Sequence, residues 1–346
     1  MKALVYHGPG RFSWEEKAKP KISAPTDAIV KISRTTICGT DLHILKGDVP
    51  TVTDGRTLGH EGVGVVVEKG EAVANFGIGD KVLISCISSC GRCDYCRRQM
   101  YSHCRSGGWI LGNKIDGTQA EYVRIPFADT SLYRAPQGVD EEALAMLSDI
   151  FPTGFECGVL NGAIKPGDSV AIVGAGPIGL ATLITARLYS PAQITMIDVD
   201  DQRLAVAMEF GATGKLNSRT CDAVQTLLRS TDGIGVDVAI EAVGIPDTFD
   251  ICQQIVAPGG HVANIGVHGK PAPLRLERLW DRNITITTRL VDTSTTPMLL
   301  KAVTCGAIQP GRLITHRFRL SETPKAYETF ANAAREKALK VVMAAD

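Results

Sequence analysis

The first part of the chain consists of short apolar runs separated by turn-forming residues. Three of these runs, residues 28–38 (AIVKISRTTIC), 62–70 (GVGVVVEKG) and 80–86 (DKVLISC), are rich in β-branched side chains and are bounded by Gly, Pro or Asp. This pattern is typical of the strands of a barrel or sandwich. Up to about residue 148, the sequence therefore predicts a β-rich domain.

From about Gly154 the pattern changes to apolar strands that alternate with glycine turns and helical segments, as in DSVAIVGAGPIGLATLITARLY. Continuous apolar strands alternating with helices indicate a parallel, doubly wound sheet. The alternation stops near residue 288, and residues 322–338 and 339–344 predict a terminal helix and strand. The expected fold is α/β with two domains, one formed by residues 1–150 and 288–346, the other by residues 151–287.

Composition narrows the classes of function. Among 346 residues, 37 Lys and Arg balance 37 Asp and Glu, so the net charge gives no reason to expect a nucleic acid or an anionic membrane as partner. The sequence contains no run of about 18 apolar residues, so it predicts no membrane span. Ten cysteines without a recognisable secretion signal favour metal binding in a reducing cytoplasm over disulfides.

A glycine-rich turn is the clearest ligand signal in the second domain. Gly174, Gly176 and Gly179 follow the spacing G-x-G-x-x-G after an apolar strand, and Pro177 and Ile178 open the next helix. In a dinucleotide site the first glycine makes the turn, the second admits the pyrophosphate, and the third lets helix and strand approach. The free N–H groups of the helix N-terminus then face the phosphates. The alternative is a turn that binds nothing.

The acid that closes the following strand distinguishes the two nicotinamide cofactors. Asp198 stands nineteen residues after Gly179, where a carboxylate accepts hydrogen bonds from ribose hydroxyls and repels a 2′-phosphate. Arg203 is near in sequence, but Asp200 and Asp201 make the surroundings negative. NAD is therefore favoured over NADP.

Four cysteines, Cys90, Cys93, Cys96 and Cys104, lie within fifteen residues with the spacing C-x2-C-x2-C-x7-C. Such spacing can bring four thiolates to one tetrahedral zinc, which would be structural because no position stays open. An iron–sulfur cluster is an alternative, although its usual last spacing is shorter and is followed by Pro. A redox C-x-x-C pair lacks the expected setting here, and His103 is an alternative fourth ligand.

Other candidate residues are scattered. TTICGTDLHI contains Cys38, Thr40, Asp41 and His43, LGHEGVG contains His60 and Glu61, and LSDIFPTGFEC contains Asp149. Each has an ordinary structural explanation when it is considered alone, for example a core cysteine, a turn histidine or a helix cap.

Taken together, the order CGTDLH, GHEGVG, four cysteines, an acid and GAGPIG resembles the zinc-dependent medium-chain alcohol dehydrogenases over essentially the whole chain. The resemblance implies a GroES-like catalytic domain and a Rossmann domain. It also implies a catalytic zinc held by Cys38, His60 and Asp149, with Glu61 as a neighbouring or exchanging ligand. Alcohol dehydrogenase zinc is otherwise bound by two cysteines and a histidine. Asp149 in the third position is similar to the bacterial tetrameric secondary alcohol dehydrogenases, which often lack the four-cysteine lobe.

The resemblance assigns further roles. A zinc ion with three protein ligands keeps a fourth position open, where an alcohol becomes more acidic. Thr40 would accept the alcohol proton and pass it through the cofactor ribose to His43. The residues implied to line the substrate are Thr40, Cys86, Trp109 and Leu290, and those implied to contact the cofactor, besides the glycine turn, Asp198 and Arg203, are Thr153, Val243 and Val267.

The expected protein is therefore a cytoplasmic homotetramer, or a dimer, with NAD and two zinc ions per chain. It would interconvert small or medium alcohols, mostly secondary ones, and ketones or aldehydes. A polyol, 2,3-butanediol or threonine dehydrogenase is the alternative within the family. A catalytically silent NAD-binding or metal-storage protein is the alternative outside enzymology.

Overall fold

A computed structural model describes all 346 residues and divides them into two compact units. The first, called here the catalytic unit, comprises Met1–Asp149 and Asp292–Asp346, and the second, the nucleotide unit, comprises Ile150–Val291. The predicted boundaries, at 150/151 and 287/288, lie one and four residues from those of the structure. None of the helices reaches the length and apolarity needed to cross a lipid bilayer.

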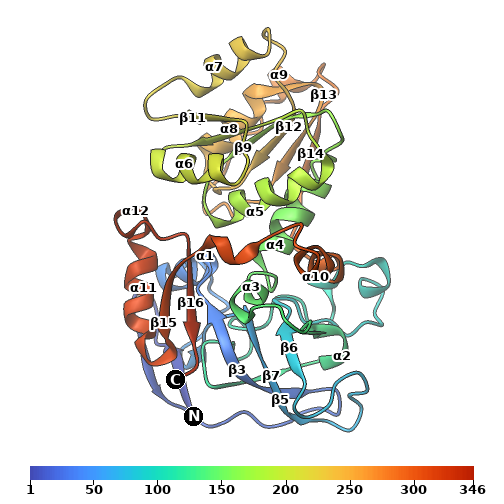
Figure 1. Ribbon diagram of the computed structural model, residues 1–346, viewed down its shortest axis with the longest axis vertical. Helices are drawn as coiled ribbons and strands as arrows, with labels where there is room; N and C mark the ends of the chain where they lie inside the picture. The colour runs from blue at the N-terminus through green and yellow to red at the C-terminus, as the bar shows by residue number, and fades with distance from the viewer. The chain divides into compact units, whose positions relative to one another are not determined.

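The catalytic unit is built on two sheets (Figure 1). The larger has the order β15-β16-β3-β5-β6-β8, with β7 also paired to β3, and the smaller has the order β2-β1-β4. The strands are β1 (Lys2–Tyr6), β2 (Phe12–Glu16), β3 (Ala28–Thr36), β4 (Arg56–Thr57), β5 (Gly62–Lys69), β6 (Lys81–Ile84), β7 (Tyr122–Ile125), β8 (Leu132–Arg134), β15 (Ile314–Arg319) and β16 (Lys340–Ala344). The C-terminal strand β16 pairs antiparallel with β3, so the end of the chain completes the sheet that its beginning starts.

Short helices connect these strands. They are α1 (Gly39–Lys46), α2 (Ala128–Ser131), α3 (Glu141–Ala145), α10 (Thr296–Thr304), α11 (Thr323–Ala331) and α12 (Ala333–Glu336). The single terminal helix predicted over 322–338 is thus two helices separated at Asn332, and α10 was not anticipated. The strand predicted over 28–38 ends at Thr36 because Cys38 is already the N-cap of α1.

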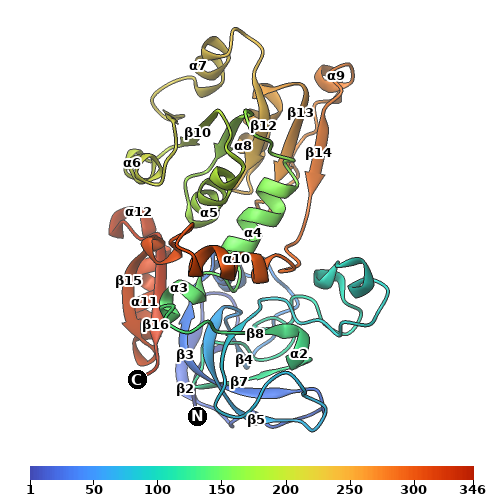
Figure 2. The ribbon, with the colours of Figure 1, turned by 45° about the vertical axis from the view of Figure 1, so that its right-hand side comes forward.

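The nucleotide unit contains one parallel six-stranded sheet of order β11-β10-β9-β12-β13-β14 (Figure 2). Its strands are β9 (Ser169–Val173), β10 (Gln193–Asp198), β11 (Gly214–Asn217), β12 (Val236–Glu241), β13 (Val256–Asn264) and β14 (Thr285–Thr288). Its helices are α4 (Ile150–Thr153), continued by a π-helix over Gly154–Leu160, α5 (Pro177–Ala186), α6 (Asp201–Glu209), α7 (Ala223–Ser230), α8 (Pro246–Ile255) and α9 (Leu276–Leu279).

The sequence explains why these helices cover the sheet. Ala223 and Leu227 of α7 are buried four residues apart, and they share one apolar cluster with α8 and with Ala171 and Val173 of the central strand. The order of the strands reverses between β9 and β12, and ligands of doubly wound sheets bind outside the carboxyl ends of the strands at such a point. The glycine turn follows β9 there, directly after Val173.

Candidate active site

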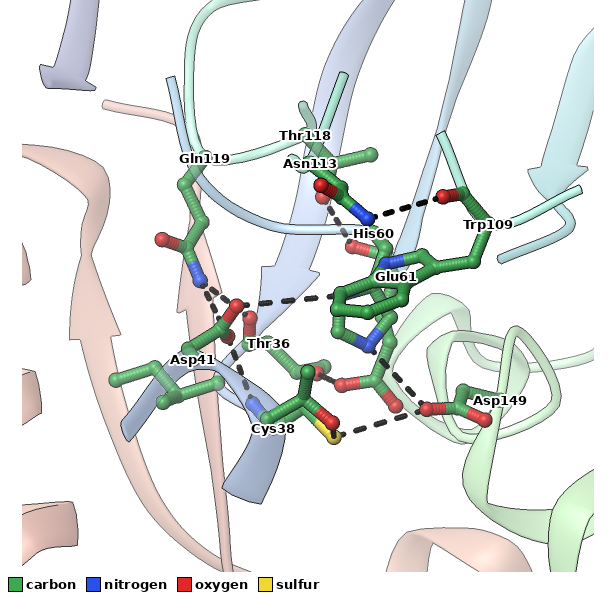
Figure 3. A network of polar contacts seen from close by, with 12 residues as sticks. Thr36, Cys38, Asp41, His60, Glu61, Trp109, Asn113, Thr118, Gln119 and Asp149 are labelled. Atoms are coloured by element: carbon green, nitrogen blue, oxygen red, sulfur yellow. Dashed lines mark hydrogen bonds and ion pairs between the residues drawn. The ribbon is translucent and has the colours of Figure 1, made fainter. Parts of the chain in front are cut away.

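Three predicted ligands, Cys38, His60 and Asp149, come together inside the catalytic unit (Figure 3). Cys38 Sγ lies 3.6 Å from Asp149 Oδ2, and His60 Nε2 lies 3.3 Å from the same oxygen. Two ligands on one tetrahedral zinc, with bonds of about 2.0–2.3 Å, are separated by about 3.3–3.8 Å. The sulfur, nitrogen and oxygen donors therefore fit a zinc ion both chemically and in spacing.

Because the three side chains are buried, their protonation states depend on whether a cation is bound. Burial raises the pKa of the Cys38 thiol, although hydrogen bonding to His60 partly offsets this. Burial lowers the pKa of His60, but hydrogen bonds to Asp149 and Cys38 outweigh it and hold the pKa well above its ordinary value. A metal requires the thiolate and the neutral imidazole, so binding of the ion displaces protons from both side chains.

A second layer of buried side chains lies behind His60. Asp41 is buried, and its Oδ2 accepts hydrogen bonds from Cys38 N at 3.0 Å and from Gln119 Nε2 at 3.1 Å. Its Oδ1 lies 3.9 Å from His60 Nδ1, and neither of these two buried atoms has a hydrogen-bond partner. Metal-bound histidines usually donate their second N–H to such a carboxylate. Tyr327 of α11 extends the layer, since its hydroxyl donates to Gln119 Oε1 at 2.8 Å.

Glu61 lies beside the three ligands, and Lys340 and Thr36 bind its carboxylate. Lys340 is 1% exposed, and its Nζ lies 2.5 Å from Glu61 Oε2 and donates to Ile37 O at 3.1 Å. Thr36 Oγ1 donates to the same Oε2, whereas Oε1 is buried without a hydrogen-bond partner. This geometry keeps one carboxylate oxygen bound to Lys340 and leaves the other unused.

Sequence reasoning assigned no role to Lys340, Asp41 or Gln119. A lysine inside the apolar run LKVVMA was the available signal, because a fully buried lysine requires a partner. The partner, 279 residues away in sequence, could not be inferred from the pattern.

The four cysteines also converge in the catalytic unit. Cys93 and Cys96 sulfurs are 3.5 Å apart and those of Cys90 and Cys96 are 3.9 Å apart, close to the roughly 3.8 Å expected around a tetrahedral zinc. Backbone N–H groups of Cys96 and Arg105 lower the pKa of Cys93 to about 6, whereas burial raises the pKa of Cys96 to about 12. A cation is therefore needed to ionise the whole set. His103 is exposed and is not part of the group.

The two relay candidates lie on one short helix. Thr40 and His43 are three residues apart in α1, a spacing that places them on the same face. Thr40 Oγ1 is 3.7 Å from Cys38 Sγ, and His43 Nδ1 is 2.9 Å from Asp48 Oδ2 with about a third of its side chain exposed. One end of the pair thus contacts the ligand cluster, while the other reaches solvent.

The substrate candidates are distributed over both units. In the catalytic unit, Cys86 is buried, and the Trp109 ring meets the His60 ring edge-on with centroids 6.1 Å apart. Trp109 also packs against the main core of this unit. Leu290 belongs to the nucleotide unit and is 46% exposed there.

The glycine turn of the nucleotide unit has the properties of a phosphate cradle. Gly174 has a φ of 109°, and a Cβ on Gly179 would lie 1.8 Å from the carbonyl oxygen of Gly174. A Cβ on Gly176, the N-cap of α5, would meet nothing within 4 Å. The fold itself therefore requires Gly174 and Gly179, whereas the fold does not require Gly176, and the open space beside it is where a pyrophosphate approaches in a dinucleotide site.

The other cofactor candidates belong to several elements of the nucleotide unit, and two of them, Asp198 and Val243, contact this turn. Asp198 ends β10, its Oδ2 accepts from Ala175 N at 2.6 Å, and its Oδ1 accepts from Val199 N at 2.7 Å. Val243 follows β12 and would collide with a Cβ on Gly174. The remaining candidates are Pro177 and Ile178 in the first turn of α5, Arg203 in α6, Thr153 at the end of α4 and Val267 after β13.

Comparison with known proteins identifies the family. Residues 24–137 match the alcohol dehydrogenase GroES-like domain and residues 177–304 match the zinc-binding dehydrogenase domain. An alcohol dehydrogenase of Cupriavidus necator is 37% identical over 99% of this chain and 98% of its own length. The chain belongs to the zinc-dependent medium-chain alcohol dehydrogenase family.

Solved structures of this family agree with the fold. Zinc-dependent alcohol dehydrogenase 2 from Streptococcus pneumonia is 56% identical, with a TM-score of 0.96 over 100% of this chain and 99% of that one. Alcohol dehydrogenase TADH from Thermus sp. ATN1 is 34% identical, with a TM-score of 0.93 over the full length of both chains. The predicted fold class, a GroES-like domain with a Rossmann-type domain, is confirmed.

The buried ion pair yields a stability prediction. Lys340→Met removes the cation and leaves the Glu61 carboxylate buried, so the free energy of unfolding should fall by about 3 kcal/mol in urea titrations. Lys301→Met, at an exposed position of α10, is the matched control and should be within about 0.5 kcal/mol of wild type. The double change Lys340→Met with Glu61→Gln should recover part of the loss. Equal stability of the two lysine variants would contradict this account.

The glycine turn yields a second prediction. Gly176→Ala meets no protein atom, so it should leave the free energy of unfolding unchanged and raise the KM for the nicotinamide cofactor about tenfold or more. Gly179→Ala should instead destabilise the protein by about 1–3 kcal/mol, because its methyl group overlaps a backbone oxygen. Wild-type cofactor binding by Gly176→Ala would show that the open space is not the phosphate site.

Proposed function

We propose that this protein is an NAD-dependent alcohol dehydrogenase that oxidises small or medium alcohols, preferentially secondary ones, to ketones or aldehydes, and catalyses the reverse reaction. The observation that carries the proposal is the convergence of Cys38, His60 and Asp149 in a buried cluster with zinc-ligand spacing. The open space at Gly176 supports a dinucleotide as the second component. Family membership supports the reaction class.

The residues of the chain would divide the chemistry as follows. Cys38, His60 and Asp149 would hold the zinc, which when bound supplies the Lewis acidity that makes an alcohol more acidic, while the nicotinamide accepts the hydride. Thr40 would accept the alcohol proton, because a hydroxyl donates and accepts at once. His43 would release that proton to solvent, because about a third of its side chain is exposed.

Two separate groups of side chains would each bind one of the two proposed zinc ions. Cys90, Cys93, Cys96 and Cys104 would bind a structural zinc with all four positions filled. Glu61 would take part as an exchanging ligand through Oε1, because Oε2 is bound to Lys340. The uncharged side chains of Trp109 and Cys86, the substrate candidates of the catalytic unit, would favour uncharged alcohols.

Cofactor choice rests on Asp198. Its carboxylate is fixed by backbone N–H groups at the end of β10, where negative charge disfavours a 2′-phosphate. One relative, described as the NADP-dependent isopropanol dehydrogenase of Entamoeba histolytica, is 31% identical over 92% of this chain. Its description supports a secondary alcohol as substrate and names the competing cofactor, so both cofactors belong in the assay.

A homotetramer in the cytoplasm is the proposed form of the enzyme. Two features support self-association. Strand β14 pairs only with β13 and ends the sheet, and Trp280, just before it, is 78% exposed. An open sheet edge offers unpaired N–H and C=O groups to a strand of another chain, and an exposed Trp beside it would add apolar contact area.

Metal analysis combined with a substrate panel tests the function. The purified protein should contain two zinc ions per chain and should reduce NAD faster with 2-propanol than with 2,3-butanediol, sorbitol or L-threonine. The ratio of kcat/KM values should favour NAD over NADP.

Variants of the ligand candidates test the two zinc sites separately. Cys38→Ser or His60→Ala should lose one zinc and nearly all activity, whereas Cys93→Ala should lose the other zinc first. Full metal occupancy at the four cysteines alone, with none at Cys38, would refute the proposal.

A separate variant tests the proton path. Thr40→Val removes the hydroxyl but keeps the volume, so kcat should fall about 10²–10⁴-fold while both zinc ions remain bound. Thr40→Ser retains the hydroxyl and should keep most of the activity. Near-normal turnover by Thr40→Val would eliminate this relay.

A further inference from the structure

The four-cysteine lobe is fastened to the segment where the chain re-enters the catalytic unit. Asp292 is the first residue of that unit after the nucleotide unit ends at Val291, and it is 2% exposed. Its Oδ1 accepts two hydrogen bonds from Ser102, one from the backbone N at 2.8 Å and one from Oγ at 2.6 Å. Ser102 is itself buried and lies between the metal-ligand candidates Cys96 and Cys104.

The hydrogen bonds from Ser102 to Asp292 are of a strong kind. Hydrogen bonds to an ionised carboxylate are about twice as strong as neutral ones, and a buried carboxylate needs such donors to remain in its place. Both Ser102 donors belong to a short helical turn, Tyr101–His103, that leads into Cys104. The position of the donors therefore depends on the conformation of the lobe.

The next residue, Thr293, is held in a conformation that its side chain disfavours. Its φ is 60°, in the left-handed region that is unusual for a β-branched residue. Surrounding contacts maintain it: Ser85 Oγ lies 2.8 Å from Thr293 Oγ1, and the Tyr133 hydroxyl donates to Thr293 O at 2.8 Å. Such a conformation persists only when its surroundings determine it strongly.

We propose that Ser102 is a positioning residue through which the four-cysteine lobe fixes the start of the returning segment, residues 292–296. The inference rests on the proposed function, because the reaction requires the cofactor of the nucleotide unit to act with the metal site of the catalytic unit. The segment at Asp292 is one of the two chain connections between these units. Filling the lobe with metal orders Ser102, and Ser102 orders the connection.

Hydrogen exchange in the full-length, zinc-loaded protein tests this directly. Ser102→Ala should accelerate amide exchange in a peptide spanning residues 289–296 about tenfold, since local opening becomes easier when one of two donors is lost. Ser106→Ala makes the same chemical change at an exposed position of the same lobe and should leave exchange unchanged. Ser102→Thr keeps the hydroxyl and should restore protection. Equal exchange in Ser102→Ala and Ser106→Ala would overturn the proposal.

A second measurement separates positioning from mere local packing. The Kd for NADH, measured by fluorescence titration without any alcohol, should rise about fivefold in Ser102→Ala with two zinc ions still bound. Faster exchange with an unchanged Kd would refute the positioning role.

Should Ser102→Ala fail to fold, Cys93→Ser can replace it. This change removes a metal ligand of the lobe and should likewise accelerate exchange in residues 289–296, and unchanged exchange would refute the coupling. Absence of NADH binding by the wild type would refute the proposed cofactor, while the exchange comparison still tests the coupling.

Discussion

The site depends on keeping three unlike donors buried at van der Waals distance from one another. The Cys38 thiol and the His60 imidazole lie 3.6 and 3.3 Å from the same Asp149 oxygen, and the opposing effects on the pKa of His60 show that the three groups compete for protons. A divalent ion would remove this competition, because its two positive charges replace the protons on the thiol and the imidazole. The surrounding architecture is best understood as the support of this cluster.

That support comes from distant parts of the chain. Asp41 and Gln119 stand behind His60, Tyr327 from the C-terminal helix fixes Gln119, and Lys340 from the last strand neutralises Glu61. Each of these polar groups is buried, so each needs its partner to avoid the cost of an unpaired charge or dipole. The antiparallel pairing of β16 with β3 explains how Lys340 reaches Glu61, and α11 supplies Tyr327. The last helices and strand therefore contribute side chains beside the ligand cluster.

The two groups of candidate metal ligands have different relations to the rest of the fold. The three-ligand cluster lies within a network of buried charges, whereas the four-cysteine lobe is a loop whose own backbone N–H groups lower the pKa of Cys93. The lobe is attached through Ser89 to Thr130 and Ser131, and through Ser102 to Asp292. The proposed role of Ser102 concerns the second of these attachments and does not require a metal in the lobe to touch substrate.

The sequence by itself determined the features that depend on local pattern. Apolar runs with β-branched residues predicted the strands, the spacing of Gly174, Gly176 and Gly179 predicted the turn after a buried strand, and cysteine spacing predicted the metal lobe. The strands and the turn are present, and the four cysteines converge, because short-range geometry fixes these features; the metal that the cysteines would bind stays a prediction. The ligand set from Cys38, His60 and Asp149 needed the family resemblance, since residues 111 positions apart show no period.

Only the tertiary structure decided which polar groups meet. It placed Lys340 against Glu61 and Ser102 against Asp292, contacts that span 279 and 190 residues. It also divided the predicted terminal helix at Asn332 and distinguished Gly176, which faces open space, from Gly179, which faces backbone. All of these features have the same physical reason. The partner of a buried charge, and the atoms that surround a glycine, depend on how the strands pair in space. The spacing of residues along the sequence does not specify that pairing.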